Sequence, residues 1–167
     1  IYWERGLLLA QGMRYDNPRR TQLLYVEGQM RLALGQTEEG LELFHQATLQ
    51  RPDIMDTHIQ YYKQLSNVGQ LETADKYFDT YVQKALHPDI LAIIQYDLAV
   101  GHYDLATKHL ELLRQRKKIP HEVAVLSALI LLAQGQSEQA MVSARQAVMS
   151  YPSVLPKLLP YFPELQL

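Results

Sequence analysis

Apolar residues recur along most of the chain at intervals of three and four residues, the spacing that places side chains on one face of an α-helix. This pattern stops at four glycines, Gly35, Gly69, Gly101 and Gly135, which recur at a nearly constant spacing. A glycine ends a helix at little steric cost because it tolerates a left-handed backbone, and the acidic residues that follow favour the start of another helix. Each glycine therefore marks the corner of a predicted helical hairpin.

The predicted helices cover almost the whole chain. We expect them near residues 2 to 14, 18 to 34, 37 to 50, 53 to 68, 71 to 85, 88 to 100, 103 to 117, 121 to 134 and 137 to 150. A compact helical bundle is the alternative fold, but a bundle has no reason to repeat the same turn at a regular period along the chain. The pattern therefore favours a solenoid of stacked hairpins.

Small residues follow each turn glycine by five positions, where they would let two helices approach closely: Gly40, Ala74, Ala106 and Ala140. Pro52 and Pro152 stand at matching positions after the first and last turn glycines and would stop one helix before the next begins. Together these features resemble the tetratricopeptide repeat (TPR), a helical hairpin whose sequence period is close to the spacing of the four glycines. The resemblance implies an all-α fold, an α-solenoid of TPR-like antiparallel helix pairs that form a right-handed superhelix.

The same resemblance divides the chain into a single array. Its parts are the second helix of a truncated repeat (1–18), four repeats (19–52, 53–86, 87–119 and 120–152) and an apolar, proline-rich tail (153–167). Because the chain begins inside a repeat and without an initiator Met, we expect it to be part of a larger protein. The tail is too apolar for a free linker, so we expect it to cap the last repeat or to occupy a groove.

Asp97 departs from the repeat pattern, because it stands four residues before a turn glycine, where the family places a packed aromatic side chain. A buried carboxylate needs a partner, so we expect Asp97 to turn toward solvent.

Of the six histidines, the closest pair, His102 and His109, lies two helical turns apart, roughly 10 Å by the helical rise and too far for one zinc ion. We therefore interpret the histidines as surface residues.

Composition removes several classes of function. The chain has no cysteine, which excludes disulfides, thiolate metal sites and thiol nucleophiles, and its net charge of -2 creates no field that would gather nucleic acid. The longest apolar stretch, 123–133, is shorter than the roughly 20 residues that cross a bilayer.

The basic run 114–118 falls at a predicted helix end, where cations complement the helix dipole. Familiar catalytic motifs are absent from the sequence, so we expect no enzyme activity, no cofactor and no metal site.

In the tetratricopeptide family the first helices of successive repeats line a concave surface that binds a peptide or helix of another protein. The positions that match this surface are Tyr25, Gln29, Ile59, Gln60, Lys63, Asn67, Leu91, Gln95, Leu126 and Leu129, with Ala33, Leu98 and Val125 beside them. Their amides and apolar side chains suit an amphipathic helix or an extended neutral segment. Members that grip a chaperone carboxylate carry Lys, Asn and Arg at such positions, and that clamp is missing here.

The resemblance therefore favours a non-catalytic protein-interaction scaffold. Membrane-linked assembly or export systems are one setting, and a cytoplasmic adaptor is another. The alternative function is a structural module whose apolar end surfaces form a homo-oligomer. We expect a cytoplasmic location, with a periplasmic protein or the soluble domain of a membrane-anchored protein as alternatives.

Overall fold

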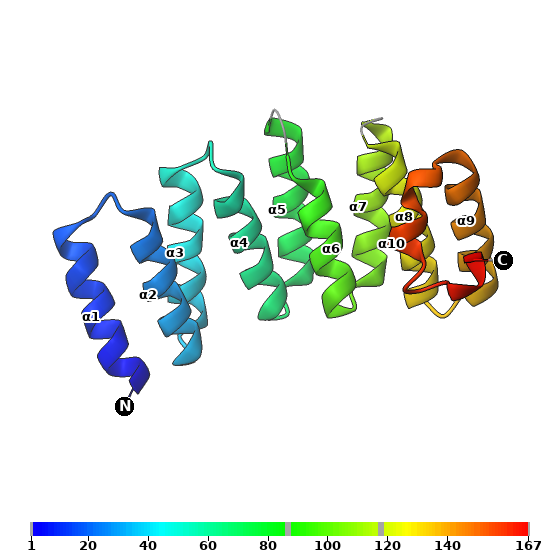
Figure 1. Ribbon diagram of the computed structural model, residues 1–167. Coiled ribbons are helices and arrows are strands. Elements are labelled where there is room, and N and C mark those ends of the chain that lie inside the picture. The colour runs from blue at the N-terminus through cyan, green and yellow to red at the C-terminus, as the bar shows by residue number, and fades with distance from the viewer. Residues whose placement is uncertain (1, 86–87, 117–118, 167) are drawn as a thin grey trace. The chain divides into compact units, whose positions relative to one another are not determined.

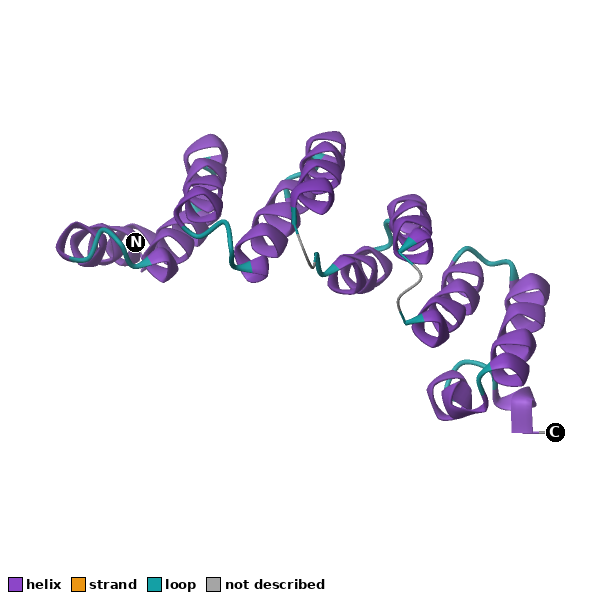
Figure 2. Cartoon of the chain, turned by 90° about the horizontal axis from the view of Figure 1, so that it is seen from above, coloured by secondary structure: helices purple, strands orange, loops and turns teal. Residues whose placement is uncertain are grey.

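The computed structural model describes residues 2–85, 88–116 and 119–166, and all regular secondary structure in these ranges is helical. The helices pack sequentially in adjacent pairs, which is the architecture of an α-solenoid (Figure 1). The predicted all-α solenoid is therefore confirmed. The chain divides into two compact units, unit 1 (Ile1–Pro88) and unit 2 (Asp89–Leu167). Figure 2 shows that short loops join the two helices of each hairpin.

Unit 1 contains five helices among its described residues, and each packs against its neighbour in the chain. They are α1 (Tyr2–Asp16), α2 (Thr21–Ala33), α3 (Thr37–Gln50), α4 (Met55–Asn67) and α5 (Leu71–Lys84).

Unit 2 contains two further hairpins and the tail. Its helices are α6 (Ile90–Val100), α7 (Tyr103–Gln115), α8 (Pro120–Ala133) and α9 (Ser137–Ser150), followed by the 3-10 turn η1 (Pro152–Val154), the short α10 (Leu155–Leu158) and a second 3-10 turn, η2 (Pro163–Gln166). The helices from α1 to α9 begin and end within three residues of the predicted bounds. The predicted helix end at residue 117 lies outside the described residues.

The four turn glycines adopt the predicted left-handed conformation, with φ angles of 77°, 83°, 84° and 78°. In each turn the amide after the glycine donates to the carbonyl four residues before the glycine, for example from Gln36 to Arg31 at 2.9 Å and from His102 to Asp97 at 2.8 Å. This hydrogen bond satisfies a carbonyl at the helix end that has no partner within the helix. A side chain at any of the four glycines would strain the backbone.

The small residues after the turns are buried where the two helices of a pair meet, as the repeat pattern predicts. The contact is closest between α2 and α3. A Cβ atom added to Gly28 would lie 2.8 Å from the Phe44 ring and 3.2 Å from the Gly40 carbonyl oxygen. Both distances are too short for a relaxed contact, so this pair of helices requires glycine at position 28.

The expectation for Asp97 and His109 was wrong. Both side chains are fully buried, with a relative exposure of 0%, and Asp97 Oδ2 lies 2.8 Å from His109 Nδ1. Asp97 on α6 and His109 on α7 each face the interface of their hairpin, so neither reaches water. Each supplies the hydrogen-bonding partner that the other needs, and this offsets part of the cost of burying two polar groups.

Candidate functional site: an apolar groove in unit 2

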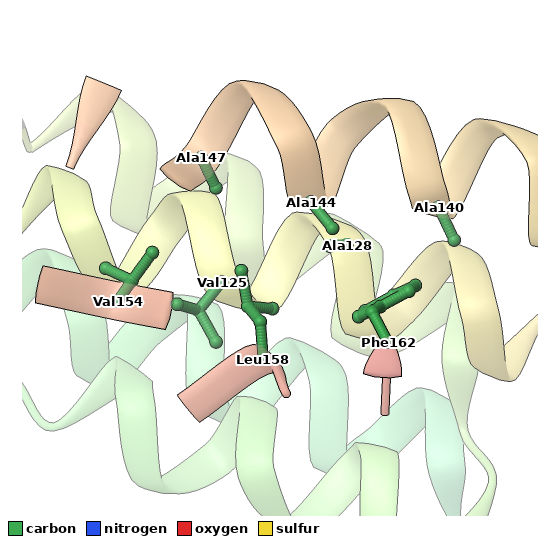
Figure 3. Close-up of a cluster of buried hydrophobic side chains, with 8 residues drawn as sticks. All are labelled: Val125, Ala128, Ala140, Ala144, Ala147, Val154, Leu158 and Phe162. Carbon is green, nitrogen blue, oxygen red and sulfur yellow. The ribbon is translucent and has the colours of Figure 1, made fainter. Parts of the chain in front are cut away.

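The tail after α9 packs onto α8 and α9 through one side of its helical turns. Val154, Leu158 and Phe162 are spaced four residues apart, and each is at most 2% exposed. Figure 3 shows these side chains pointing toward apolar residues of α8 and α9. Their partners in this cluster are Val125, Ala128, Ala140, Ala144 and Ala147. The tail therefore caps the last hairpin, which was one of the two roles expected for it.

Another side of the tail borders a groove with a volume of about 710 Å³. The first helices of the two hairpins, α6 and α8, form its floor and walls, and tail residues close one side. The lining residues are Gln95, Leu98, Ala99, Glu122, Val125, Leu126, Leu129, Leu132, Ala133, Lys157 and Tyr161. Most of these side chains are aliphatic, so the groove is suited to an apolar ligand surface.

The few polar groups in the groove come from its edges. Lys157 forms an ion pair with Glu122, which links the tail to the start of α8 and leaves little net charge there. Gln95 is exposed on α6, and Tyr161 is 56% exposed on the tail. Such an arrangement offers apolar anchoring with one free amide and one aromatic ring at the rim. It offers no charged group that would select a strongly acidic or basic ligand.

The structure brings together five of the predicted groove residues: Gln95, Leu98, Val125, Leu126 and Leu129. Leu91 is half-buried on α6 and lies outside the lining. The sequence reasoning did not assign Lys157 and Tyr161 to the groove. The available signal was their four-residue spacing, one position before Leu158 and Phe162, which indicates a helical tail with one buried and one open side.

The remaining predicted residues lie on α2 and α4 in unit 1. Tyr25 stacks on Phe44 with ring centroids 5.5 Å apart, and burial together with the Asp56 carboxylate raises the pKa of Tyr25 to about 12. Ile59 is buried, and the Gln60 amide donates to Asp56 Oδ1 at 3.2 Å. Tyr25 and Ile59 therefore contribute to packing. The other members are Gln29 and Asn67, which are exposed, and Lys63, which is half-buried.

His58 in unit 1 is held by hydrogen bonds to other residues of the same unit. His58 Nδ1 lies 2.6 Å from the Tyr77 hydroxyl oxygen, and His58 Nε2 lies 3.1 Å from the Pro52 carbonyl oxygen. Because a carbonyl only accepts, Nε2 carries the hydrogen, and Nδ1 of the neutral ring accepts from Tyr77. Burial lowers the pKa of His58 and holds it in this neutral form. Both ring nitrogens of His58 therefore form hydrogen bonds within unit 1.

A buried carboxylate in unit 1 escaped the sequence reasoning. The Glu27 side chain is 1% exposed and accepts from Arg14 on α1 at 2.5 Å and from Arg31 on its own helix at 3.1 Å. Burial would raise the pKa of Glu27, but the hydrogen bonds from Arg14 and Arg31 outweigh it and lower the pKa. Arg31 stands at the same repeat position as Asp97, four residues before a turn glycine. Each unit therefore has a polar group there that requires a partner.

No model of a protein family matches the chain, and no curated protein matches it. Within the part of the chain that the structure describes, no helix is both long enough and apolar enough to cross a membrane. Residues 2–85, 88–116 and 119–166 also contain no group of three histidine or acidic side chains arranged to hold a metal ion.

Proposed function

We propose that this chain is a non-catalytic protein-interaction scaffold of the tetratricopeptide type. Its ligand is the apolar face of an amphipathic helix, or an extended segment of neutral character, of another protein. The observation that carries this proposal is the open apolar groove between α6, α8 and the tail. The periodic turns and the small residues at the helix contacts support the assignment to this type of repeat.

The lining suggests how such a ligand is held. Apolar side chains of the ligand would pack against Leu98 and Leu129, which are both half-buried in the free chain and so retain surface to cover. The Gln95 amide would hydrogen-bond the ligand backbone and set its register. Because Lys157 is already paired with Glu122, we expect only a modest effect of salt on binding.

This function fits a membrane-linked assembly or export system and a cytoplasmic adaptor equally well. We propose a cytoplasmic location, with the periplasm or the soluble domain of an anchored protein as alternatives. The proposal includes no cofactor, metal or nucleic acid. The alternative function is a structural module that assembles into a homo-oligomer.

The repeat offers a matched pair of variants for the test. Ala99 lines the groove, and Ala33 stands at the same position of a hairpin in unit 1, two residues before its turn glycine. Both alanines are exposed. A photoreactive amino acid at Gln95 would first capture the ligand in cells, with Gln115 on α7 as the control position. Mass spectrometry would then identify the captured segment.

We expect Ala99→Arg to weaken binding of the captured protein at least tenfold, because a long charged side chain would fill an apolar groove. Ala33→Arg should leave the affinity unchanged. Titration calorimetry measures both, and circular dichroism checks that the helices are retained. Equal effects of the two variants, or capture from Gln115 but not from Gln95, would rule out the groove as the binding site.

A further inference from the structure

Three arginines line one cleft in unit 1, which has a volume of about 480 Å³. The cleft lies between the turn that joins α1 to α2 and the loop that joins α3 to α4, and Figure 1 shows both connections at the same end of these helices. Asp16 and Asp56 are close in sequence, but neither lines the cleft. The lining residues are Asn17, Pro18, Arg19, Arg20, Thr21, Gln22, Arg51 and Ile54.

Two of the three guanidinium groups have no carboxylate partner. Arg51 Nε and Nη2 lie 3.2 and 3.1 Å from the two carboxylate oxygens of Asp53. Arg19 and Arg20 are exposed, and neither forms an ion pair with a carboxylate in the described part of the chain. Three cations and one anion leave a net charge of +2 at the cleft, in a chain whose overall net charge is -2. Positive charge is thus concentrated at this place.

The two unpaired arginines do not stabilise the helix that follows them. Helix α2 begins at Thr21, and cations close to the start of a helix are unfavourable because its dipole is positive there. The helices α3, α4 and α5 of the same unit carry acidic residues in the first turn, whereas α2 carries none. One repeat further on, Asp53 stands at the position of Arg19. Helix stability therefore does not explain arginine at positions 19 and 20.

A buried hydroxyl group also lines the cleft. Thr21 is the only buried residue of the lining, with a relative exposure of 8%. Its hydroxyl oxygen lies 3.4 Å from Gln50 Oε1, which is longer than the about 3.0 Å of an ordinary O–H···O hydrogen bond. Buried polar groups usually have a well-formed partner. The Thr21 hydroxyl is thus only weakly engaged by the protein and can donate to an oxygen atom of a ligand.

These groups together suit a doubly charged oxyanion. A guanidinium group presents parallel N–H donors that match two oxygens of a phosphate group. A phosphate monoester carries a charge of about -1.5 to -2 at neutral pH, which matches the charge of the cleft. A single carboxylate, or one phosphodiester of a nucleic acid, carries only one negative charge. The charge balance therefore favours a phosphate monoester.

We propose that this cleft binds the terminal phosphate of a phosphate monoester, through Arg19, Arg20 and the Thr21 hydroxyl. The phosphate group belongs to a phosphorylated side chain or to a small free compound, and the protein contacts are the same in both cases. Because the arginines are exposed, binding is weak and is screened by salt. This proposal does not rest on the groove in unit 2.

A pair of small probes tests which charge the cleft recognises. Phenyl phosphate and phenyl sulfate have similar size and shape, but the sulfate ester carries a single negative charge. We expect phenyl phosphate to shift the backbone amide signals of Thr21 and Gln22 in an NMR titration and to bind about fivefold more tightly than phenyl sulfate. Equal affinities, or shifts that leave these two amides unchanged, would overturn the proposal.

Arginine variants test the site with a matched control. Arg20→Gln should reduce the affinity for phenyl phosphate on the order of tenfold, because a charge-assisted hydrogen bond is lost. Arg5→Gln changes the net charge by the same amount, at an exposed position on α1 that is outside the lining, and should leave the affinity unchanged. Equal losses for the two variants would show unspecific attraction and would contradict a site at Arg20.

A variant with the opposite effect sharpens the test. Asp53→Asn should increase the affinity for phenyl phosphate, because it releases the Arg51 guanidinium toward the cleft. The control is Glu72→Gln on α5, which releases Lys76 from a similar exposed ion pair and changes the net charge equally. It should leave the affinity unchanged. No gain for Asp53→Asn, or the same gain for both variants, would overturn the proposal.

A phosphoserine peptide and inorganic phosphate, titrated in the same way, distinguish the source of the phosphate. Tighter binding of the peptide, lost when the peptide is dephosphorylated, would assign the cleft to a phosphorylated protein segment. Equal binding of the two would assign it to a small free phosphate compound. Both outcomes support the proposal. A single-stranded oligonucleotide without a terminal phosphate that bound more tightly than both would instead mark a nucleic-acid contact and overturn it.

Discussion

The last hairpin of unit 2 and the first helix of unit 1 are held in opposite ways. In unit 2 the tail buries Val154, Leu158 and Phe162 against α8 and α9. In unit 1 the only buried residue of α1 is Ala10, and the helix is tied to α2 by the ion pair between Arg14 and the buried Glu27. The tail is thus attached mainly by apolar packing, whereas the attachment of α1 depends strongly on charge.

The two segments also differ in which apolar side chains they leave exposed. Each hairpin has two apolar sides, and a terminal one leaves a side uncovered unless a segment with a polar outer surface closes it. The tail provides such a cover, because its buried residues alternate with exposed Pro156, Pro160 and Lys157. On helix α1, Leu8, Leu9 and Met13 are exposed. The comparison predicts that variants in the tail and in α1 respond differently.

The largest effect is expected in the tail. Phe162→Ala should lower the free energy of unfolding by about 3 to 5 kcal/mol, because it removes a fully buried aromatic ring and leaves a cavity. The adjacent control, Tyr161→Ala, changes a residue that is 56% exposed and should have an effect within about 0.5 kcal/mol. Urea denaturation followed by circular dichroism measures both. Similar losses for the two variants would contradict the role of Phe162 in the cap.

A smaller effect is expected where α1 joins α2. Glu27→Gln should destabilise the contact by about 1 to 3 kcal/mol, because hydrogen bonds to a charged acceptor are replaced by weaker ones to an amide. Trp3 is the single tryptophan of the chain and lies on α1, so its fluorescence anisotropy reports loosening of that helix. The control is Glu42→Gln, which changes an exposed carboxylate on α3 and should leave the anisotropy unchanged.

Acid should act on the same contact. Since the folded-state pKa of Glu27 is lowered, its stabilising contribution is complete above the ordinary glutamate pKa of about 4.3 and is lost as the pH falls through the folded value. The unmodified chain should therefore show a drop in Trp3 anisotropy in acid at a higher pH than any loss of the tail. That early drop should be absent in Glu27→Gln. A tail that loosens first would contradict the assignment of the two kinds of attachment.

The smallest effect is expected at Leu9. Leu9→Ala should change the free energy of unfolding by no more than about 0.5 kcal/mol, because the side chain is 67% exposed. Thermal unfolding followed by circular dichroism measures the effect. A large loss would show that Leu9 is packed in the folded chain.

The regular features of the fold could be predicted because they depend on local chemistry. A left-handed turn favours glycine, and a close helix contact favours a small residue. Gly101 and Ala106 therefore predicted a hairpin from the local sequence alone. The same reasoning was wrong for Asp97. A carboxylate alone is more stable in water, so Asp97 was predicted to be exposed. Its burial is tolerated because His109, on the other helix of the pair, supplies a hydrogen-bonding partner.

The groove shows the same difference between features set by local sequence and features set by contacts between separate segments. Gln95, Leu126 and Leu129 could be placed on first helices because their repeat positions are visible in the sequence. Lys157 and Tyr161 could not be placed there, because their positions depend on how the tail folds back onto α8.

By itself, the sequence determined the helices, their turns and the small residues at their contacts, since each depends on residues close together in the chain. Only the tertiary structure decided which polar groups are buried, which side of the tail borders the groove and which side of α1 stays open. Those outcomes depend on contacts between separate helices, where a partner or its absence changes the free energy of burial by more than any local preference does.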